Sequence, residues 1–165
     1  MGSDPEWLTR APLQIELVPR TSWGANLRSM LRRKDWDRLR KDQYAQAGNV
    51  CEICGGKGKR HPVECHEIWS YNETDFVQKL EGLIALCPGC HRCKHPGQTQ
   101  AMGLGQMIVP HLCRVNGWSK WEADKALCLA FTQWQRRSTK EWSVNTDWLV
   151  ENRAELLEIK KGPNE

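Results

Sequence analysis

The sequence predicts an α+β fold in which a mainly helical chain surrounds one small unit of two strands and a helix. Cysteines and histidines concentrate within residues 51–95, where two Cys-x-x-Cys pairs bracket a histidine and a glutamate. Two segments of this stretch, residues 62–69 and 82–86, have strand-like sequences. Further along, apolar residues recur at helical spacing over residues 119–137. We therefore expect two metal sites to share the small unit and the remaining chain to support them.

The length and charge of the chain limit its organisation. A chain of 165 residues can form one domain with a real core. We divide it into an N-terminal strand and basic helix (residues 1–48), the metal-rich unit (residues 49–97) and a C-terminal helical region (residues 98–165), packed as one compact domain. The net charge of +4 permits a nucleic-acid partner without requiring one.

The cysteines indicate the redox compartment. Eight cysteines could form a disulfide framework or ligate metal, and their pairing beside histidines favours metal. The N-terminal residues lack the basic-then-apolar pattern of a signal peptide. No apolar run approaches the roughly 18 residues of a membrane span. We expect a cytoplasmic protein with reduced thiols and no membrane association.

The N-terminal region combines a short strand with a basic helix. Residues 13–18 alternate apolar and polar side chains and predict a strand, followed by a loop over residues 19–26. Residues 27–47 predict a helix that ends at Gly48-Asn49. Between residues 28 and 60, ten Lys or Arg face four acids, an excess larger than that of the whole protein. A solvated helix face explains this charge, but a surface that contacts nucleic-acid phosphates does so equally. The candidate phosphate contacts are Arg28, Arg32, Arg33, Lys34, Lys57, Lys59 and Arg60.

The C-terminal region is predicted to be helical after one loop. Residues 96–106 are Gly-rich and predict that loop, and residues 108–115 predict a short helix with Pro110 in its first turn. Ser119-Lys-Trp-Glu122 is a capping box that opens a helix to about residue 137. Thr146 is predicted to cap a last helix that runs to about residue 161, with Trp148, Leu149, Leu156 and Ile159 turned inward.

Four cysteines form the first candidate metal site. Each Cys-x-x-Cys turn brings two sulfurs near one point, and two such turns complete a tetrahedron suited to zinc. The site comprises Cys51, Cys54, Cys87 and Cys90. A shell of four thiolates leaves no open position, so this zinc would tie the chain together rather than catalyse a reaction. Among the remaining cysteines, Cys93 lies near enough in sequence to be a spare ligand.

Three histidines form the second candidate metal site. His91 and His95 are four residues apart, so on a helix that begins at Pro88 they share one face and can bind one cation. His66, from the first strand, completes a three-ligand set with open positions, which is typical of catalytic metal sites. Glu67 could act as general base on a water. Because neighbouring strand residues face opposite ways, both residues serve one site only if the strand ends or bulges there.

The order of these motifs resembles the HNH endonuclease family. The matching segments are CEIC, VECHEI, LIALC and CPGCHRCKH, and they cover about residues 51–95. The resemblance implies a ββα-metal unit pinned by a zinc ion on four cysteines. It matches His66 to the family's first-strand ligand, and His91 and His95 to the ligands of the helix. It also implies hydrolysis of DNA phosphodiester bonds with one divalent ion while a base activates water.

Two positions depart from the family pattern. Glu67 stands where the family usually has the general-base histidine. A carboxylate can act as the base, but its reference pKa is about 4.3, so its basicity differs. Gly82 stands where many members carry an asparagine that braces a loop, a place that Asn72 could fill. In a second register Cys65 would be the ligand and His66 the base. The cation stays open, because imidazoles suit Zn2+, Ni2+ or Mn2+ and Mg2+ prefers oxygen ligands.

Three functions are compatible with the sequence. The first is a metal-dependent HNH-type endonuclease acting on DNA, with RNA not excluded as substrate. The second is a catalytically inactive, zinc-stabilised nucleic-acid-binding module. The third, a structural zinc domain that binds protein, leaves His66, His91 and His95 without a purpose, so we favour the first.

Overall fold

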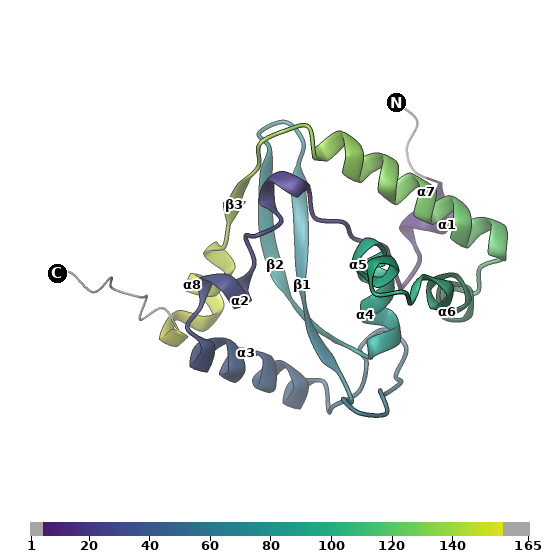
Figure 1. The fold of residues 1–165 in the computed structure, drawn as a ribbon. Helices are drawn as coiled ribbons and strands as arrows, with labels where there is room; N and C mark the ends of the chain where they lie inside the picture. Colours follow the sequence, from purple (N-terminus) through teal and green to yellow (C-terminus); the bar gives the residue numbers. More distant parts are fainter. Residues whose placement is uncertain (1–4, 157–165) are drawn as a thin grey trace.

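The α+β, mainly helical fold is confirmed by a computed structural model that describes residues 5–156. Figure 1 shows a long hairpin at the centre, with helices on both sides of it. The helices are α1 (Glu6–Thr9), α2 (Leu27–Met30), α3 (Arg33–Gln46), α4 (Pro88–Lys94), α5 (Pro96–Ala101), α6 (Ile108–Asn116), α7 (Lys120–Arg137) and α8 (Asp147–Arg153). The strands are β1 (Glu64–Asn72), β2 (Val77–Leu86) and β3 (Ser143–Asn145), and short 3-10 turns cover Arg20–Ser22, Gly105–Met107 and Ala154–Leu156.

The sheet is the two-stranded core of the metal-rich unit with one added strand. β1 and β2 pair antiparallel, with His66 opposite Ile84, and the register shifts between Ile68 and Trp69. β3 pairs with β2 in parallel, which leaves β1 at the edge of the described sheet. Both strands extend further toward the hairpin turn than predicted. The Asn72 side chain accepts hydrogen bonds from the backbone of Thr74 and Asp75, so the turn is tight enough for pairing to continue up to it.

Two hydrophobic clusters lie on opposite faces of this sheet. One contains Leu86, Ile108 and Leu112 of α6 and Ala123 of α7, and the four cysteines of the predicted zinc site are part of it or pack against it. The other contains Leu39 of α3, Leu80 and Leu149 of α8. In Figure 1, α2, α3 and α8 accordingly lie on one side of the hairpin and α4 to α7 on the other. The sheet therefore lies between α4, which carries His91, and the helices α2 and α3, which carry the basic residues Arg28 and Arg33.

The predicted strand over residues 13–18 is wrong, because this segment pairs with no strand. The Asn116 side chain of α6 takes its place: it accepts from the Leu13 N–H at 3.0 Å and donates to the Leu13 carbonyl at 2.8 Å. Leu13 is fully buried. The alternation thus reported a half-buried extended segment, whose backbone is satisfied by an amide side chain rather than by a sheet.

The predicted loop over residues 96–106 is also wrong in large part, because α5 and a 3-10 turn occupy most of it. Pro96 stands at the first helical position, where the missing N–H costs no hydrogen bond. Thr99 is buried and donates to the Arg92 carbonyl at 2.9 Å, which fixes α5 on the end of α4. Gly103, with a φ of 73°, forms the turn that remains.

The other helices follow the sequence pattern with local differences. The predicted helix over residues 27–47 is interrupted between α2 and α3, where Leu31 has an extended ψ of 154°. The capping box of Ser119 and Glu122 opens α7, which ends at Arg137 as predicted. Thr146 makes no side-chain cap for α8, since Asn145 instead accepts from the Asp147 N–H. The continuation to residue 161, with Ile159, lies outside the described residues.

No helix in residues 5–156 has both the length and the apolar character that crossing a bilayer requires.

Candidate metal centres

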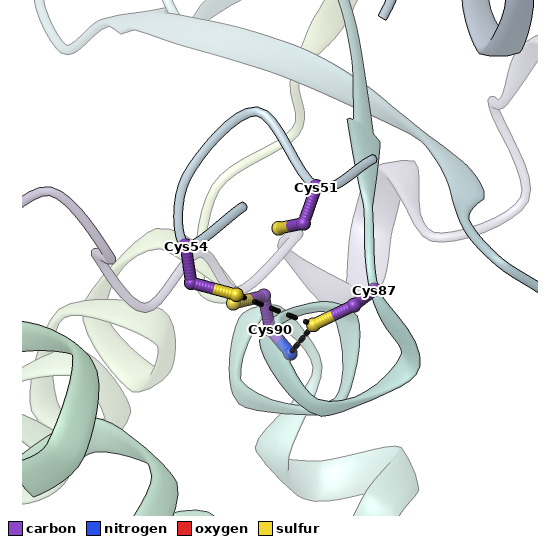
Figure 2. Close-up of side chains that lie close together, drawn as sticks. All are labelled: Cys51, Cys54, Cys87 and Cys90. Atoms are coloured by element: carbon purple, nitrogen blue, oxygen red, sulfur yellow. Dashed lines mark hydrogen bonds between the residues drawn. The ribbon is translucent and has the colours of Figure 1, made fainter. Parts of the chain in front are cut away.

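The four cysteines of the predicted zinc site converge on one point (Figure 2). Their sulfurs all lie within 4.8 Å of one another, and those of Cys54 and Cys87 are 3.6 Å apart. Four sulfurs at about 2.3 Å from one zinc ion would lie about 3.8 Å apart in a tetrahedron. Cys51, Cys87 and Cys90 are buried. The cluster therefore has the donors, spacing and enclosure of a structural zinc site, and it could hold that ion.

The ionisation of these thiols supports the same assignment. A hydrogen bond with Cys90 lowers the pKa of Cys51 to about 4. The same bond raises the pKa of Cys90, and burial raises that of Cys87. Four thiolates so close together need a divalent ion to offset their repulsion.

Two glycines allow neighbouring groups to approach closely beside the cysteine cluster. A Cβ on Gly89 would come within 2.3 Å of the His111 ring, and a Cβ on Gly58 would come within 2.1 Å of the His61 carbonyl. With glycine at position 89, His111 of α6 reaches α4 and its Nε2 lies 3.2 Å from the Cys90 sulfur. A donor to a ligating sulfur tunes the metal site from outside its ligand shell. No sequence pattern predicts the contact of His111 with Cys90, because that contact depends on how α6 packs on α4.

Three histidines form a second group that could hold a metal ion. His66 from β1, His91 from α4 and His95 at the C-cap of α4 offer nitrogen atoms that lie within 4.8 Å of one another. The ring centroids are 4.9 to 5.4 Å apart and the rings meet edge to face. The structure thus brings together the three histidines that the spacing grouped. His91 follows Cys90 directly on α4. Because neighbouring positions of a helix point in different directions, the two residues can belong to different metal sites.

Two of these histidines contact carboxylates. The Nδ1 of His91 contacts the Glu64 carboxylate, and the Nε2 of His66 lies 3.1 Å from Oε2 of Glu16. The other Glu16 oxygen accepts from the buried Lys94 ammonium at 2.6 Å. Such carboxylates fix the orientation of ligating histidines and raise their basicity. Glu64 could have been found from sequence, because it is two residues from His66 and shares its strand face. Glu16 could not.

Burial favours the neutral form of His66 and His95, which is the form that ligates metal. Burial lowers the pKa of His95 to about 3, and the nearby His66 and His91 act in the same direction. Burial also lowers the pKa of His66, although the hydrogen bond with Glu16 opposes the shift. Burial would raise the pKa of Glu16, but His66 and Lys94 together bring it below the usual glutamate value. A neutral imidazole backed by an ionised carboxylate is a competent metal ligand.

Glu67 lies on the opposite face of β1 from His66. The ladder is regular at both residues, since Glu67 pairs with Leu83 and the register shifts only after Ile68. The carboxylate accepts from the Leu27 N–H at 2.8 Å and from Trp69 Nε1 at 3.2 Å, so it also fixes the start of α2. Burial raises the pKa of Glu67, against both hydrogen bonds. The cavity that contains the histidines reaches Glu67 around the edge of the sheet, so its role as base stays a prediction.

The remaining residues of the predicted site have other surroundings. Cys65 is outside the group of three histidines, and burial raises its pKa to about 12. Cys93 is buried against the Ile108 carbonyl and is not part of the cysteine cluster. Gly82 pairs with Ile68 beside the register shift. Asn72 lies six residues along β1 from His66, about 20 Å away, and is occupied in the hairpin turn.

Two adjoining hollows connect the histidines with the basic helix. The histidine cavity, of about 360 Å³, is lined by His66, His91, His95, Glu16, Glu67 and Arg28. The basic groove, of about 890 Å³, is lined by His91, Glu64, Arg28, Arg33, Arg40 and Trp36. His91 and Arg28 belong to both hollows, so the groove leads from the basic residues to the histidines.

The predicted phosphate contacts divide into two groups. Arg28 and Arg33 line the basic groove, whereas Arg32 is paired with Asp35. Lys34 is exposed and borders neither hollow. Lys57, Lys59 and Arg60 are exposed on the loop after the first cysteine pair and also border neither hollow. Sequence reasoning missed Arg40 as a groove residue, although it belongs to the same basic segment.

Comparisons with known proteins leave the family of this chain unassigned. No family model and no solved structure matches it. It is similar to protein indeterminate-domain 12 of Arabidopsis thaliana, with 25% identity over 105 residues that cover 60% of this chain and 23% of the plant protein. The chain thus spans about a quarter of that relative's length.

Proposed function

We propose that the protein is a metal-dependent endonuclease of the HNH type that hydrolyses DNA phosphodiester bonds. One observation carries the proposal: three histidines converge at the junction of a cavity and a groove lined by arginines. A purely structural metal site has no need of open space or of a phosphate-binding surface beside it. The separate four-cysteine cluster accounts for folding and leaves the histidines free for chemistry.

Each group has a defined role in this proposal. His66, His91 and His95 hold one divalent ion, for which Mg2+, Mn2+, Ni2+ and Zn2+ are the candidates. Such an ion supplies positive charge to the phosphate and to the leaving oxygen. Glu16 and Glu64 orient His66 and His91. Arg28 and Arg33 hold the phosphate backbone in the basic groove. Glu67 lies on the other face of β1 but lines the histidine cavity, so it can accept the proton of the attacking water only where that cavity passes the sheet edge.

A second candidate function is a zinc-stabilised nucleic-acid-binding module without catalysis. The position of Glu67 favours it, because both carboxylate oxygens already accept hydrogen bonds on the α2 side of β1. In this reading the histidine group and the groove bind nucleic acid, and Glu67 acts only in holding α2.

Plasmid cleavage in the presence of each of the four ions tests the proposal. Wild-type protein is expected to nick or linearise the plasmid, and His91→Ala to lower the rate by roughly 10²-fold or more. His61→Ala is the matched control, since His61 is exposed and outside the histidine group. Tight plasmid binding without cutting under all four ions would establish the binding module instead. RNA of the same sequence, assayed in parallel, defines the substrate.

The same assay assigns the base. Glu67→Gln is expected to keep ion and DNA binding and to lose about 10²- to 10⁴-fold in rate. Its amide also disturbs the bond from Trp69, so Trp69→Phe, which removes only that donor, is the control for a structural effect. Equal losses in the two variants would remove Glu67 from the mechanism.

A further inference from the structure

A second cavity, which the proposed chemistry does not use, opens beside His95. This aromatic cavity, of about 310 Å³, is lined by Trp23, Phe131, Trp134, Arg20, His95 and Gln98. Its volume is at the lower end of the range for small-molecule sites, roughly 300–1,000 Å³. Trp23, His95 and Gln98 also line the histidine cavity. A ligand bound at the histidines could therefore extend into the aromatic cavity without leaving the protein surface.

The walls of the aromatic cavity are fixed on one side and open on the other. Trp134 of α7 donates from Nε1 to the Val18 carbonyl at 3.0 Å, and its ring meets Phe131 edge to face at 6.3 Å. The Arg20 guanidinium lies 4.9 Å from the centre of the Trp134 ring. Trp23 lines the same cavity with 54% of its surface exposed. An exposed tryptophan in a cavity that also contains fixed aromatic rings and a cation is unusual for a wall that serves packing alone.

The chemistry of this cavity matches a nucleobase. Aromatic rings and arginine planes are the groups on which proteins stack unpaired bases, and stacking accepts every base. Gln98, exposed where the two cavities join, offers an amide that can donate to and accept from a base edge. Arg20 supplies positive charge for the adjoining phosphate. Because one sugar separates a base from its phosphate, the sharing of His95 places both within the reach of one nucleotide.

We propose that the aromatic cavity binds an unpaired nucleobase next to the phosphate held at His66, His91 and His95. The inference rests on the proposed nuclease function and deepens it, since it makes single-stranded or locally unpaired DNA the preferred substrate. A base inside a duplex has its faces covered by its neighbours and cannot enter unless it is turned out of the stack.

Equilibrium binding of fluorescent single-stranded and duplex oligonucleotides tests the inference. The measurement uses the full chain with His91→Ala, which is expected to cut too slowly to consume the oligonucleotide, with and without Trp23→Ala. Trp23→Ala is expected to weaken single-strand binding by roughly 5- to 150-fold, the loss of one stacked base, and to change duplex binding by less than about 2-fold. Trp121→Ala is the matched control, because Trp121 is 65% exposed on α7 and lines neither cavity. It is expected to have no effect on either ligand.

The outcomes separate this inference from the proposed function. Equal effects of Trp23→Ala and Trp121→Ala, or an equal loss on duplex and single strand, would overturn the aromatic cavity as a base site while leaving plasmid cleavage intact. A Trp23-dependent preference for single strands in a wild-type protein that cuts no substrate would support the base site and overturn the nuclease. Placing one abasic residue at successive positions of the single strand is expected to reproduce the Trp23→Ala loss at one position only.

Discussion

The four-cysteine cluster and the three-histidine group share α4 but differ in how they are built. The cysteine cluster takes all its donors from two short turns and is largely buried. The histidine group takes one donor from β1, one from α4 and one from the C-cap of α4. It contacts one carboxylate from β1 and one from residues 13–18, and it lies at the wall of two cavities. The first is closed by its own ligands, whereas the second needs the whole fold and remains open.

This difference implies a one-way dependence. Cys87 and Cys90 fix the start of α4, and the same helix carries His91 and His95. Loss of the cysteine-bound zinc should therefore disrupt both sites. Loss of the histidine-bound ion should leave the cysteine cluster intact, because its four donors are all cysteines. Three variants probe this asymmetry, beginning with the largest expected effect.

Removal of the first cysteine pair is expected to abolish cooperative folding. In Cys51→Ser/Cys54→Ser the zinc is lost, and in a site of this kind the binding free energy is folding free energy, about 10 kcal/mol or more. Thermal unfolding followed by circular dichroism, together with metal analysis, measures the effect. Cys113→Ser/Cys128→Ser is the control, since both thiols lie outside the cluster. A cysteine-pair variant that melts like wild type would disprove the structural zinc.

Removal of the charge behind His91 is expected to weaken only the histidine site. Glu64→Gln should lower the affinity for Ni2+ by about 10- to 100-fold and change the free energy of unfolding by less than about 1 kcal/mol, because Glu64 is partly exposed. Calorimetric titration of zinc-loaded protein gives the affinity. Glu81→Gln, the same change on β2 next to Ser70, should alter neither quantity. Unchanged affinity in Glu64→Gln would separate this carboxylate from metal binding.

Neutralising basic residues on the two sides of the unit is expected to have the smallest and most selective effect. Arg28→Ala/Arg33→Ala removes two charges from the basic groove. If both contact phosphates, the logarithmic salt slope of DNA affinity should decrease by about 1.8, or about 0.9 for each contact. Lys57→Ala/Lys59→Ala removes equal charge from the loop beside the cysteines and should change the slope by less. The reverse order would place DNA on the cysteine side.

The sequence was most informative where donors are close neighbours along the chain. The spacing of Cys51 with Cys54 and of Cys87 with Cys90 constrains geometry through single turns, and His91 with His95 through one helical turn. The capping box at Ser119 is local for the same reason, and it opens α7 as expected. These are features that a few adjacent φ and ψ angles determine.

What could not be predicted depends on distant packing. Glu16 reaches His66 across 50 residues, and His111 reaches Cys90 through the packing of α6 on α4. The placement of His66 and Glu67 on opposite sheet faces required the register of β1. The misassigned strand over residues 13–18 has the same origin, because its partner is the side chain of Asn116, 103 residues away. No short-range pattern encodes a partner of this kind.

The segment over residues 13–18 also sets the order in which the molecule can be completed. It carries Glu16, yet it is held by Asn116 and by Trp134, whose indole bonds Val18 across 116 residues. As the chain emerges from a ribosome, the cysteine and histidine donors are all present well before either anchor. Contacts between such distant residues form late in folding. The histidine site therefore reaches its final form only after α7 has docked, whereas the four cysteines of the candidate zinc site are available before Glu16 is fixed beside His66.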